Sequence, residues 1–196
     1  VKIPTDQPES DGTLELDSTT LVLVEAAGGG RTGIGYTYAG TATAALIHDK
    51  LAAQVKGRDA MDIPAAWEAM VRSIRNLGRP GICSMAISAM DGALWDLKAR
   101  LLDISLITLL GRAREGVPVY GSGGFTSYTI AQLELQLGTW VAEGIPRMKM
   151  KIGRDAAADR DRVRAARTVI GPAAALFVDA NGAYSRKQAL TQAEAF

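Results

Sequence analysis

The sequence has 196 residues, 47% of them hydrophobic and 22% charged, which is the composition of a globular protein with enough apolar material for a core. It contains 22 basic and 21 acidic residues, and a formal charge of +1 gives no sign of nucleic acid or a membrane surface as a partner. No run of about 18 apolar residues occurs, so we expect no transmembrane helix. The single cysteine, Cys83, excludes an internal disulfide, fits a reducing cytoplasm, and is expected in the core.

Both ends of the sequence indicate a piece of a longer chain. The opening residues, VKIPTDQPES, lack an initiator Met and do not form a signal peptide, so we expect further residues upstream. At the other end, Phe196 lies within a helical pattern, and a natural end is not expected there. The length by itself suggests one or two domains.

A glycine-rich turn between two extended patterns predicts a β-hairpin near the N-terminus. Residues 19–27 read TTLVLVEAA, and the pattern stays extended after the glycines. The glycines of Gly28–Gly33 also match G-x-G-x-x-G, but a dinucleotide site needs a helix to begin on them. Because the helical pattern begins only near Thr41, we expect Thr20–Glu25 to pair antiparallel with Ile34–Tyr38. A nucleotide-binding α/β protein is the weaker alternative.

Three helices are predicted in the first 115 residues. They cover residues 42–56, 63–77 and 83–102. The only histidine, His48, lies in the first of them, and we interpret it as solvated or cap-facing rather than as a metal ligand or a base. The third helix is apolar on almost all sides, which indicates burial. Asp91 and Asp96 within it need partners, and we expect Arg or Lys neighbours.

From residue 117 the pattern changes to alternating strands and helices. Strands are predicted at 117–121, 147–152 and 175–179, with helices at 127–143, over RDAAADRDRVRAARTVI before Gly171, and from Ser185 onward. The short connections of this β-α-β-α-β-α order predict parallel neighbouring strands with right-handed crossovers. We therefore place a domain boundary near Glu115, giving domains of 1–115 and 116–196.

The segment RMKMKI carries the main chemical signal. In a strand, Met148 and Met150 point to one face while Lys149 and Lys151 share the other. Asp179, followed by Ala-Asn-Gly, ends the next strand, and ligands bind beyond the carboxyl ends of parallel strands. Neighbouring ammonium groups disfavour each other's charge, and a lysine with a lowered pKa can remove a proton. Exposed lysines on an edge strand and a polar turn are the structural alternative.

These motifs resemble those of the enolase superfamily, in its mandelate racemase and muconate lactonizing enzyme branch. The matching segments are SAMDGALWDLKARLLDISLITLLG, VPVYGSGG, KMKIG and FVDANGAYS, and the resemblance covers nearly all 196 residues. It implies an α+β capping domain followed by a (β/α)₈-type barrel, of which this chain holds about three βα units. In that family Mg²⁺ stabilises the enolate formed when a base removes the proton α to a carboxylate.

The resemblance also implies roles for single residues. Lys151 matches the acid/base on one face of the α-carbon, and Lys149 matches the lysine that contacts the substrate carboxylate. Asp179 matches the first metal ligand, and Asn181 a polar residue near metal and substrate. Residues 5–17 match the mobile capping loop that closes over the substrate.

The resemblance leaves two classes of function open. One is an enzyme acting on a small-molecule carboxylate: a racemase, epimerase, acid-sugar dehydratase or cycloisomerase. The other is a non-catalytic fragment that only binds or assembles, because the remaining metal ligands and the opposite-face base belong to strands beyond Phe196. We expect a cytoplasmic homo-oligomer with no nucleic-acid or membrane partner.

Overall fold

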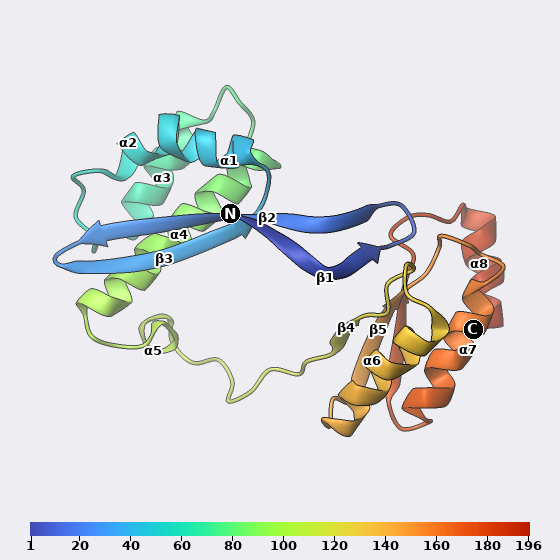
Figure 1. Cartoon of the computed structure of the whole chain (residues 1–196). Helices are drawn as coiled ribbons and strands as arrows, with labels where there is room; N and C mark the ends of the chain where they lie inside the picture. Colours follow the sequence, from blue (N-terminus) through green and yellow to red (C-terminus); the bar gives the residue numbers. More distant parts are fainter. The chain divides into compact units, whose positions relative to one another are not determined.

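The computed structural model describes every residue from Val1 to Phe196, and the chain divides into two compact units. The first comprises residues 1–3 and 19–115, and the second comprises residues 4–18 and 116–196. In the first half of the chain the elements are β1 (Lys2–Ser10), β2 (Glu15–Gly28), β3 (Arg31–Tyr38), α1 (Thr41–Leu46), the π-helix η1 (Ile47–Leu51), α2 (Ala52–Val55), α3 (Ile63–Ser73), α4 (Ile82–Leu101) and α5 (Leu106–Leu110) (Figure 1). They are followed by β4 (Gly121–Gly123), α6 (Ile130–Ala142), β5 (Arg147–Lys151), α7 (Asp159–Ile170), β6 (Ala175–Asp179) and α8 (Arg186–Ala195). None of these helices combines the length and apolar character that crossing a membrane requires.

The predicted hairpin is confirmed and is longer than expected. Strands β2 and β3 pair antiparallel from Leu21 opposite Tyr38 to Gly28 opposite Arg31. The turn consists of Gly29 and Gly30, with φ of 55° and 75°. Positive φ at both central residues is the geometry of the tight hairpin turn that glycine favours. No helix begins on these glycines, so the requirement of a dinucleotide site is not met.

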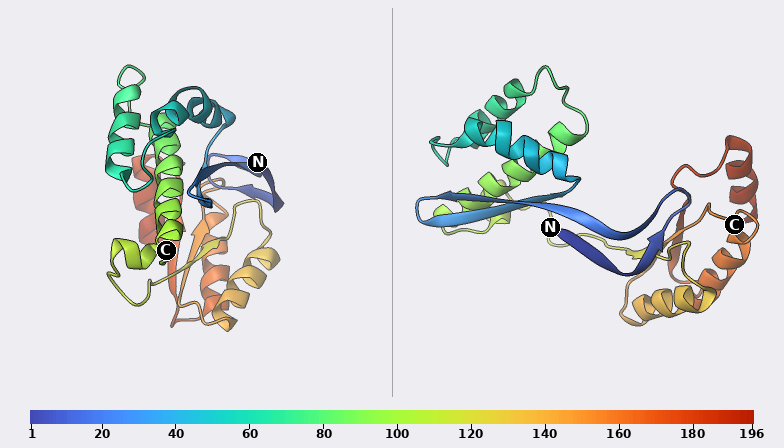
Figure 2. Two further views of the ribbon diagram at one scale, coloured as in Figure 1. Left: turned by 90° about the vertical axis from the view of Figure 1, so that its left-hand side faces the viewer. Right: turned by 45° about the horizontal axis from the view of Figure 1, so that its top comes forward.

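Helix α4 lies along the hairpin, as Figure 2 shows. Gly33 and Gly35 are buried on the face of β3 that meets the helix. A Cβ atom at Gly33 would lie 2.2 Å from the backbone nitrogen of Leu97, and one at Gly35 would lie 2.0 Å from the carbonyl oxygen of Ala89. Real Cβ atoms do not approach so closely, so this contact requires glycine on the strand.

The core of the first unit lies between α4 and the preceding helices. It contains Leu51, Met70, Ile74, Cys83, Ala86, Ile87 and Met90. Cys83 is a buried core residue, as predicted. His48 is exposed and bonds only its neighbour Asp49, which agrees with a solvated histidine.

The two aspartates of α4 differ from each other. Asp96 accepts hydrogen bonds from Arg100 and from the backbone N–H of Ile34, each at 2.8 Å, as expected for a partnered carboxylate. Asp91 makes no hydrogen bond or ion pair, so the prediction of a basic partner was wrong for this residue. Burial raises its pKa, because an ionised carboxylate loses hydration without a compensating partner.

Two predicted helices of this unit differ in detail. The helix expected at 42–56 is interrupted by one π-helical turn at Ile47–Leu51, where the hydrogen bonds span one more residue. The helix expected to reach Leu77 ends at Ser73, and the next residues form tighter turns such as the bond from Ile74 N–H to the Val71 carbonyl.

The second unit contains a parallel sheet in the order β4-β5-β6, packed against helices α6 and α7 (Figure 1). The predicted parallel neighbours are therefore confirmed. Its core consists of Leu133, Leu137, Met148, Met150, Ile152, Val163, Ala166, Ile170 and Ala174. Helices α6 and α8 begin with capping boxes, Thr129 with Gln132 and Ser185 with Gln188, which satisfy exposed backbone N–H groups at both helix starts.

The first predicted strand of this unit lies later in the chain than expected. Residues 117–120 have no regular structure, and β4 covers only Gly121–Gly123. Gly121 pairs with Met148, one residue after β5 begins at Arg147. Continuing this register would place Tyr120 opposite Arg147 and Val119 opposite Pro146, which has no N–H to donate to a partner strand, so the prediction of a strand was wrong for residues 117–120.

The segment expected as a capping loop, residues 5–17, is largely two strands joined by a turn. Strand β1 reaches Ser10, and β2 begins at Glu15. The end of β1 is tied to the loop after β4, because the hydroxyls of Ser10 and Thr126 bond each other at 2.6 Å. Thr126 also donates to the carbonyl of Asp11 at 2.8 Å.

The contact between β3 and α4 predicts that alanine substitutions of two glycines change the free energy of unfolding in opposite directions. Gly35→Ala should lower the free energy of unfolding by about 1–3 kcal/mol, because the new methyl group has no room against Ala89. Gly92→Ala, in α4 itself, should raise it by up to about 1 kcal/mol, because its Cβ would lie 3.7 Å from Gly35 and alanine favours the helix. Urea unfolding followed by tryptophan fluorescence measures both. Equal effects of the two substitutions would contradict the close contact.

Candidate active site

The alternation of β5 places its lysines and methionines on opposite faces. Met148 and Met150 are fully buried in the core of the second unit. The side chains of Lys149 and Lys151 lie on the other face, with 19% and 14% of their surface exposed. The two lysines are thus partly buried, which excludes the interpretation of freely solvated lysines on an edge strand.

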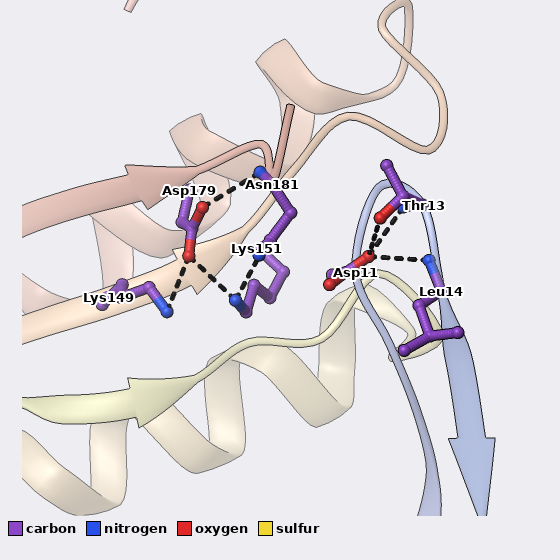
Figure 3. Close-up of polar contacts among 7 residues, drawn as sticks. All are labelled: Asp11, Thr13, Leu14, Lys149, Lys151, Asp179 and Asn181. Atoms are coloured by element: carbon purple, nitrogen blue, oxygen red, sulfur yellow. Dashed lines mark hydrogen bonds and ion pairs between the residues drawn. The ribbon is translucent and has the colours of Figure 1, made fainter. Parts of the chain in front are cut away.

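The register of β5 against β6 brings both lysines to one carboxylate. Lys151 pairs with Asp179 across the two strands. The Nζ atoms of Lys149 and Lys151 lie 2.9 Å and 2.8 Å from the same oxygen, Oδ2 of Asp179 (Figure 3). The prediction that these three side chains share one face is confirmed.

Asn181 completes this cluster from the turn after β6. Its Oδ1 accepts a hydrogen bond from Lys151 Nζ at 2.7 Å, and its backbone N–H donates to Oδ1 of Asp179 at 3.0 Å. The residue has a φ of 48°, a left-handed conformation that asparagine tolerates better than most residues, and Gly182 follows at 75°. The predicted Asn-Gly turn therefore aims the amide back at the lysine.

The charges of the cluster stabilise one another. Hydrogen bonds from Lys151 and then Lys149 hold the pKa of Asp179 well below its usual range, against the opposing effect of burial. Burial is the largest single influence on the pKa of Lys149 and lowers it, but the hydrogen bonds to Asp179 and Lys151 and the negative charges of Asp179 and Asp11 together raise the pKa. We expected the neighbouring ammonium to lower this pKa. Attraction to the carboxylate between the lysines means that the pKa of Lys149 is raised instead.

A turn at residues 11–14 faces the lysines across the site (Figure 3). Oδ1 of Asp11 accepts hydrogen bonds from the backbone N–H groups of Thr13 at 2.7 Å and Leu14 at 2.8 Å, which hold the turn in shape and lower the pKa of Asp11. The positive charge of Lys151 lowers it further. Asp11 thus remains ionised and acts electrostatically on the lysine cluster.

Gly12 allows this turn to lie directly on the strand ends. A Cβ atom there would come within 2.6 Å of the Ala183 side chain, 2.7 Å of the Ala180 carbonyl oxygen and 2.9 Å of the Ile152 carbonyl oxygen. A larger residue would lift the turn, and Asp11 with it, away from the ends of β5 and β6.

The oxygen ligands in this chain suffice for part of a magnesium site. Mg²⁺ prefers six oxygen ligands in octahedral geometry. Asp179 offers a carboxylate, and its Oδ1 accepts only one hydrogen bond, from Asn181. No group of three or more His, Cys, Asp or Glu side chains comes together anywhere in the chain. The cluster is therefore suited to contribute one carboxylate, and it does not enclose a cation by itself.

Sequence reasoning did not single out three polar residues near the strand ends. Asp11 lay in a segment treated as a whole, although its Asp-Gly-Thr spacing is typical of a turn that a carboxylate holds. Asp159 lies in the first half of the helix predicted over RDAAADRDRVRAARTVI, where an acid gives no sign of burial, although it is 1% exposed. Tyr184 carried no signal beyond its position shortly after Asp179.

Models of two protein families match this chain. The model described as mandelate racemase / muconate lactonizing enzyme, N-terminal domain, matches residues 5–111. The model described as enolase C-terminal domain-like matches residues 132–196. The two matches together cover most of the chain in the order that the sequence motifs predicted.

Individual relatives give the same result. A 3,6-anhydro-alpha-L-galactonate cycloisomerase from Streptomyces coelicolor is 34% identical over 200 residues, covering 100% of this chain and 55% of that protein. The crystal structure of a mandelate racemase/muconate lactonizing enzyme-like protein from Rubrobacter xylanophilus is 58% identical with a TM-score of 0.96, covering 99% of this chain and 54% of that one. A racemase from Streptomyces coelicolor A3(2), solved with bound magnesium, is 35% identical with a TM-score of 0.92, covering 99% and 56%.

The curated relatives are cycloisomerases and dehydratases of sugar acids, and the chain covers 55%, 50% and 41% of the length of three of them. Similar structures contain magnesium. The likeness extends over the capping domain and the first part of the barrel domain.

The charge coupling in the cluster generates a prediction for the metal-free complete protein. Lys151→Met should raise the pKa of Asp179 toward its ordinary value of about 3.9, because the carboxylate loses its nearest cation and the protonated form becomes less unfavourable. Carbon-13 NMR of labelled aspartate carboxyl groups, titrated through the acidic range in which the protein stays folded, measures this value. Arg154→Met is the control, because Arg154 pairs with Glu15 rather than Asp179. An Asp179 pKa unchanged by Lys151→Met would contradict the coupling.

Proposed function

Because this chain belongs to the mandelate racemase and muconate lactonizing enzyme branch of the enolase superfamily, we propose that the complete protein is a Mg²⁺-dependent enzyme acting on a sugar acid. Its reaction begins with removal of the proton α to the substrate carboxylate and produces an enolate. The observation that carries this proposal is the convergence of Lys149 and Lys151 on one oxygen of Asp179 at the ends of two parallel strands. Racemisation, epimerisation, dehydration and cycloisomerisation all share this first step.

The two lysines have different tasks in this proposal. Lys151 lies at the end of β5, bonded to both Asp179 and Asn181, and is the base that takes the α-proton. Lys149 lies two residues earlier, on the same face of β5. Because its pKa is raised, it stays protonated and binds the substrate carboxylate as a cation. A general base must lose its own proton before it can accept one from the substrate.

In this proposal Asp179 and Asn181 are the residues of this chain that would lie next to a bound metal. Asp179 would be one carboxylate ligand, and Asn181 lies close enough to orient either the metal's surroundings or the substrate. When bound, Mg²⁺ supplies positive charge for the enolate oxygens. The remaining ligands belong to parts of the protein outside this sequence.

The substrate class follows from what surrounds the lysines. A carboxylate suits Lys149, and the polar groups of Asp11 and Asn181 suit hydroxyl groups beside it. Sugar acids combine these features, and they are the substrates that the names of the curated relatives contain. We also propose that residues 1–115 act as the capping domain and 116–196 begin the barrel, while a cytoplasmic homo-oligomer stays a prediction.

Substitutions of two residues test the assignment in the complete protein. Lys151→Ala should slow α-proton exchange by roughly 10²–10⁴-fold, the usual contribution of general acid–base catalysis. Asp179→Asn should weaken Mg²⁺ binding and activity together, because the metal loses a charged ligand. Deuterium exchange at the α-carbon in heavy water, with a sugar acid that the wild type accepts, measures the first effect, and calorimetric titration with Mg²⁺ measures the second.

A matched control removes a lysine that lies outside the site. Lys187→Ala, on the exposed surface of α8, should exchange the α-proton at the wild-type rate. If Lys151→Ala exchanges as fast as the wild type, Lys151 is not the base. A complete protein that binds Mg²⁺ but exchanges no sugar acid would favour a role limited to binding.

A further inference from the structure

A buried carboxylate beside the candidate site joins the loops that follow β5 and β6. Asp159, the first residue of α7, is 1% exposed. Its Oδ2 accepts a hydrogen bond from the backbone N–H of Gly153 at 2.8 Å and a second, short one from the hydroxyl of Tyr184. Gly153 follows Lys151 by two residues, and Tyr184 follows Asp179 by five. One oxygen therefore holds both loops that carry the candidate catalytic groups.

The two loops also touch each other directly at this point. Gly153 has a φ of 104°, and a Cβ atom there would lie 2.8 Å from the Ala183 side chain. Gly12 meets the same Ala183 side chain from the turn at residues 11–14. The position of Ala183, set by its neighbour Tyr184, thus determines where that turn rests.

Arg162, one turn further along α7, holds the loop after β4. It is 9% exposed, and its guanidinium donates to the backbone carbonyls of Tyr128 at 2.7 Å and Phe125 at 2.8 Å. The first turn of α7 therefore bonds the loops beyond all three strands. Buried charges of this kind are costly, and Asp159 and Arg162 offset each other's charge across one helical turn.

We propose that Asp159 and Tyr184 are positioning residues, which hold the loops after β5 and β6 together so that Lys151 stays opposite Asp179. The hydroxyl of Tyr184 remains a donor at every working pH, because burial and the adjacent carboxylate raise its pKa. Neither residue touches the lysine cluster, and both act through the backbone. The kinetic part of this proposal rests on the proposed function, and the structural part does not.

Tyr184→Phe in the complete protein tests the proposal, because it removes one hydroxyl and keeps the ring. Without substrate, hydrogen–deuterium exchange should rise about tenfold or more in peptides covering 152–154 and 180–184, since hydrogen bonds to charged groups are among the stronger ones. Exchange in α6 should not change. With Mg²⁺ and a sugar acid, kcat should fall about tenfold while KM stays within about twofold, which is the result of misplacing a reacting group.

Two further variants separate positioning from a general loss of stability. Tyr128→Phe removes the hydroxyl of another buried tyrosine in the same unit and should behave as the wild type in both measurements. Asp159→Asn keeps the side-chain shape without the charge, and it should loosen the same two segments.

The exchange measurement decides the proposal even if the protein acts on no sugar acid. Unchanged exchange at 152–154 and 180–184 in both Tyr184→Phe and Asp159→Asn would overturn it. An equal rise in α6 would also overturn it, because the residues would then support the whole unit rather than these loops. Loss of activity in Lys151→Ala with normal kcat in Tyr184→Phe would leave the proposed function standing and remove the positioning role.

Discussion

The register between β5 and β6 is the constraint on which the candidate site depends. It places Lys151 opposite Asp179 and, through the two-residue period of a strand, puts Lys149 on the same face and both methionines in the core. A shift of one residue would exchange the two faces, burying two ammonium groups and exposing the core. The hydrophobic core and the charged cluster therefore select the same register.

The cluster contains two lysine cations and one aspartate anion in direct contact, so it is suited to attract an anionic ligand. Asp179 neutralises one of the two partly buried lysines, and the second positive charge is offset only at longer range, by Asp11. Buried ion pairs are not reliable sources of stability, because the loss of hydration opposes the attraction. The arrangement is better suited to receive an anion than to hold the fold together. The turn carrying Asp11 adds negative charge close by, so the field at the strand ends is mixed rather than uniformly positive.

Much of the fold and the central residues of the site could be predicted from local pattern. The alternation in RMKMKI, the double-glycine turn and the short βα connections each determine their structure through interactions within a few residues. What could not be predicted depends on distant neighbours. The start of strand β4 at Gly121 depends on its register against β5, and the pKa of Lys149 rises through attraction to a carboxylate 30 residues away that lies between the lysines. The burial of Asp159 could not be distinguished from a solvated helix-start acid, because its donors come from two separate loops.

The two methionines of β5 have a consequence for resistance to oxidation. Met148 and Met150 are fully buried beneath the lysines, on the other side of a single strand. Methionine sulfoxide is polar and would not fit such a core, so an oxidised strand could not keep its packing. Peroxide reaches these sulfur atoms only when the unit opens, so the intact fold protects them. Oxidative damage at this strand would displace the lysines without modifying them, and a sulfoxide reductase could act only on the opened chain.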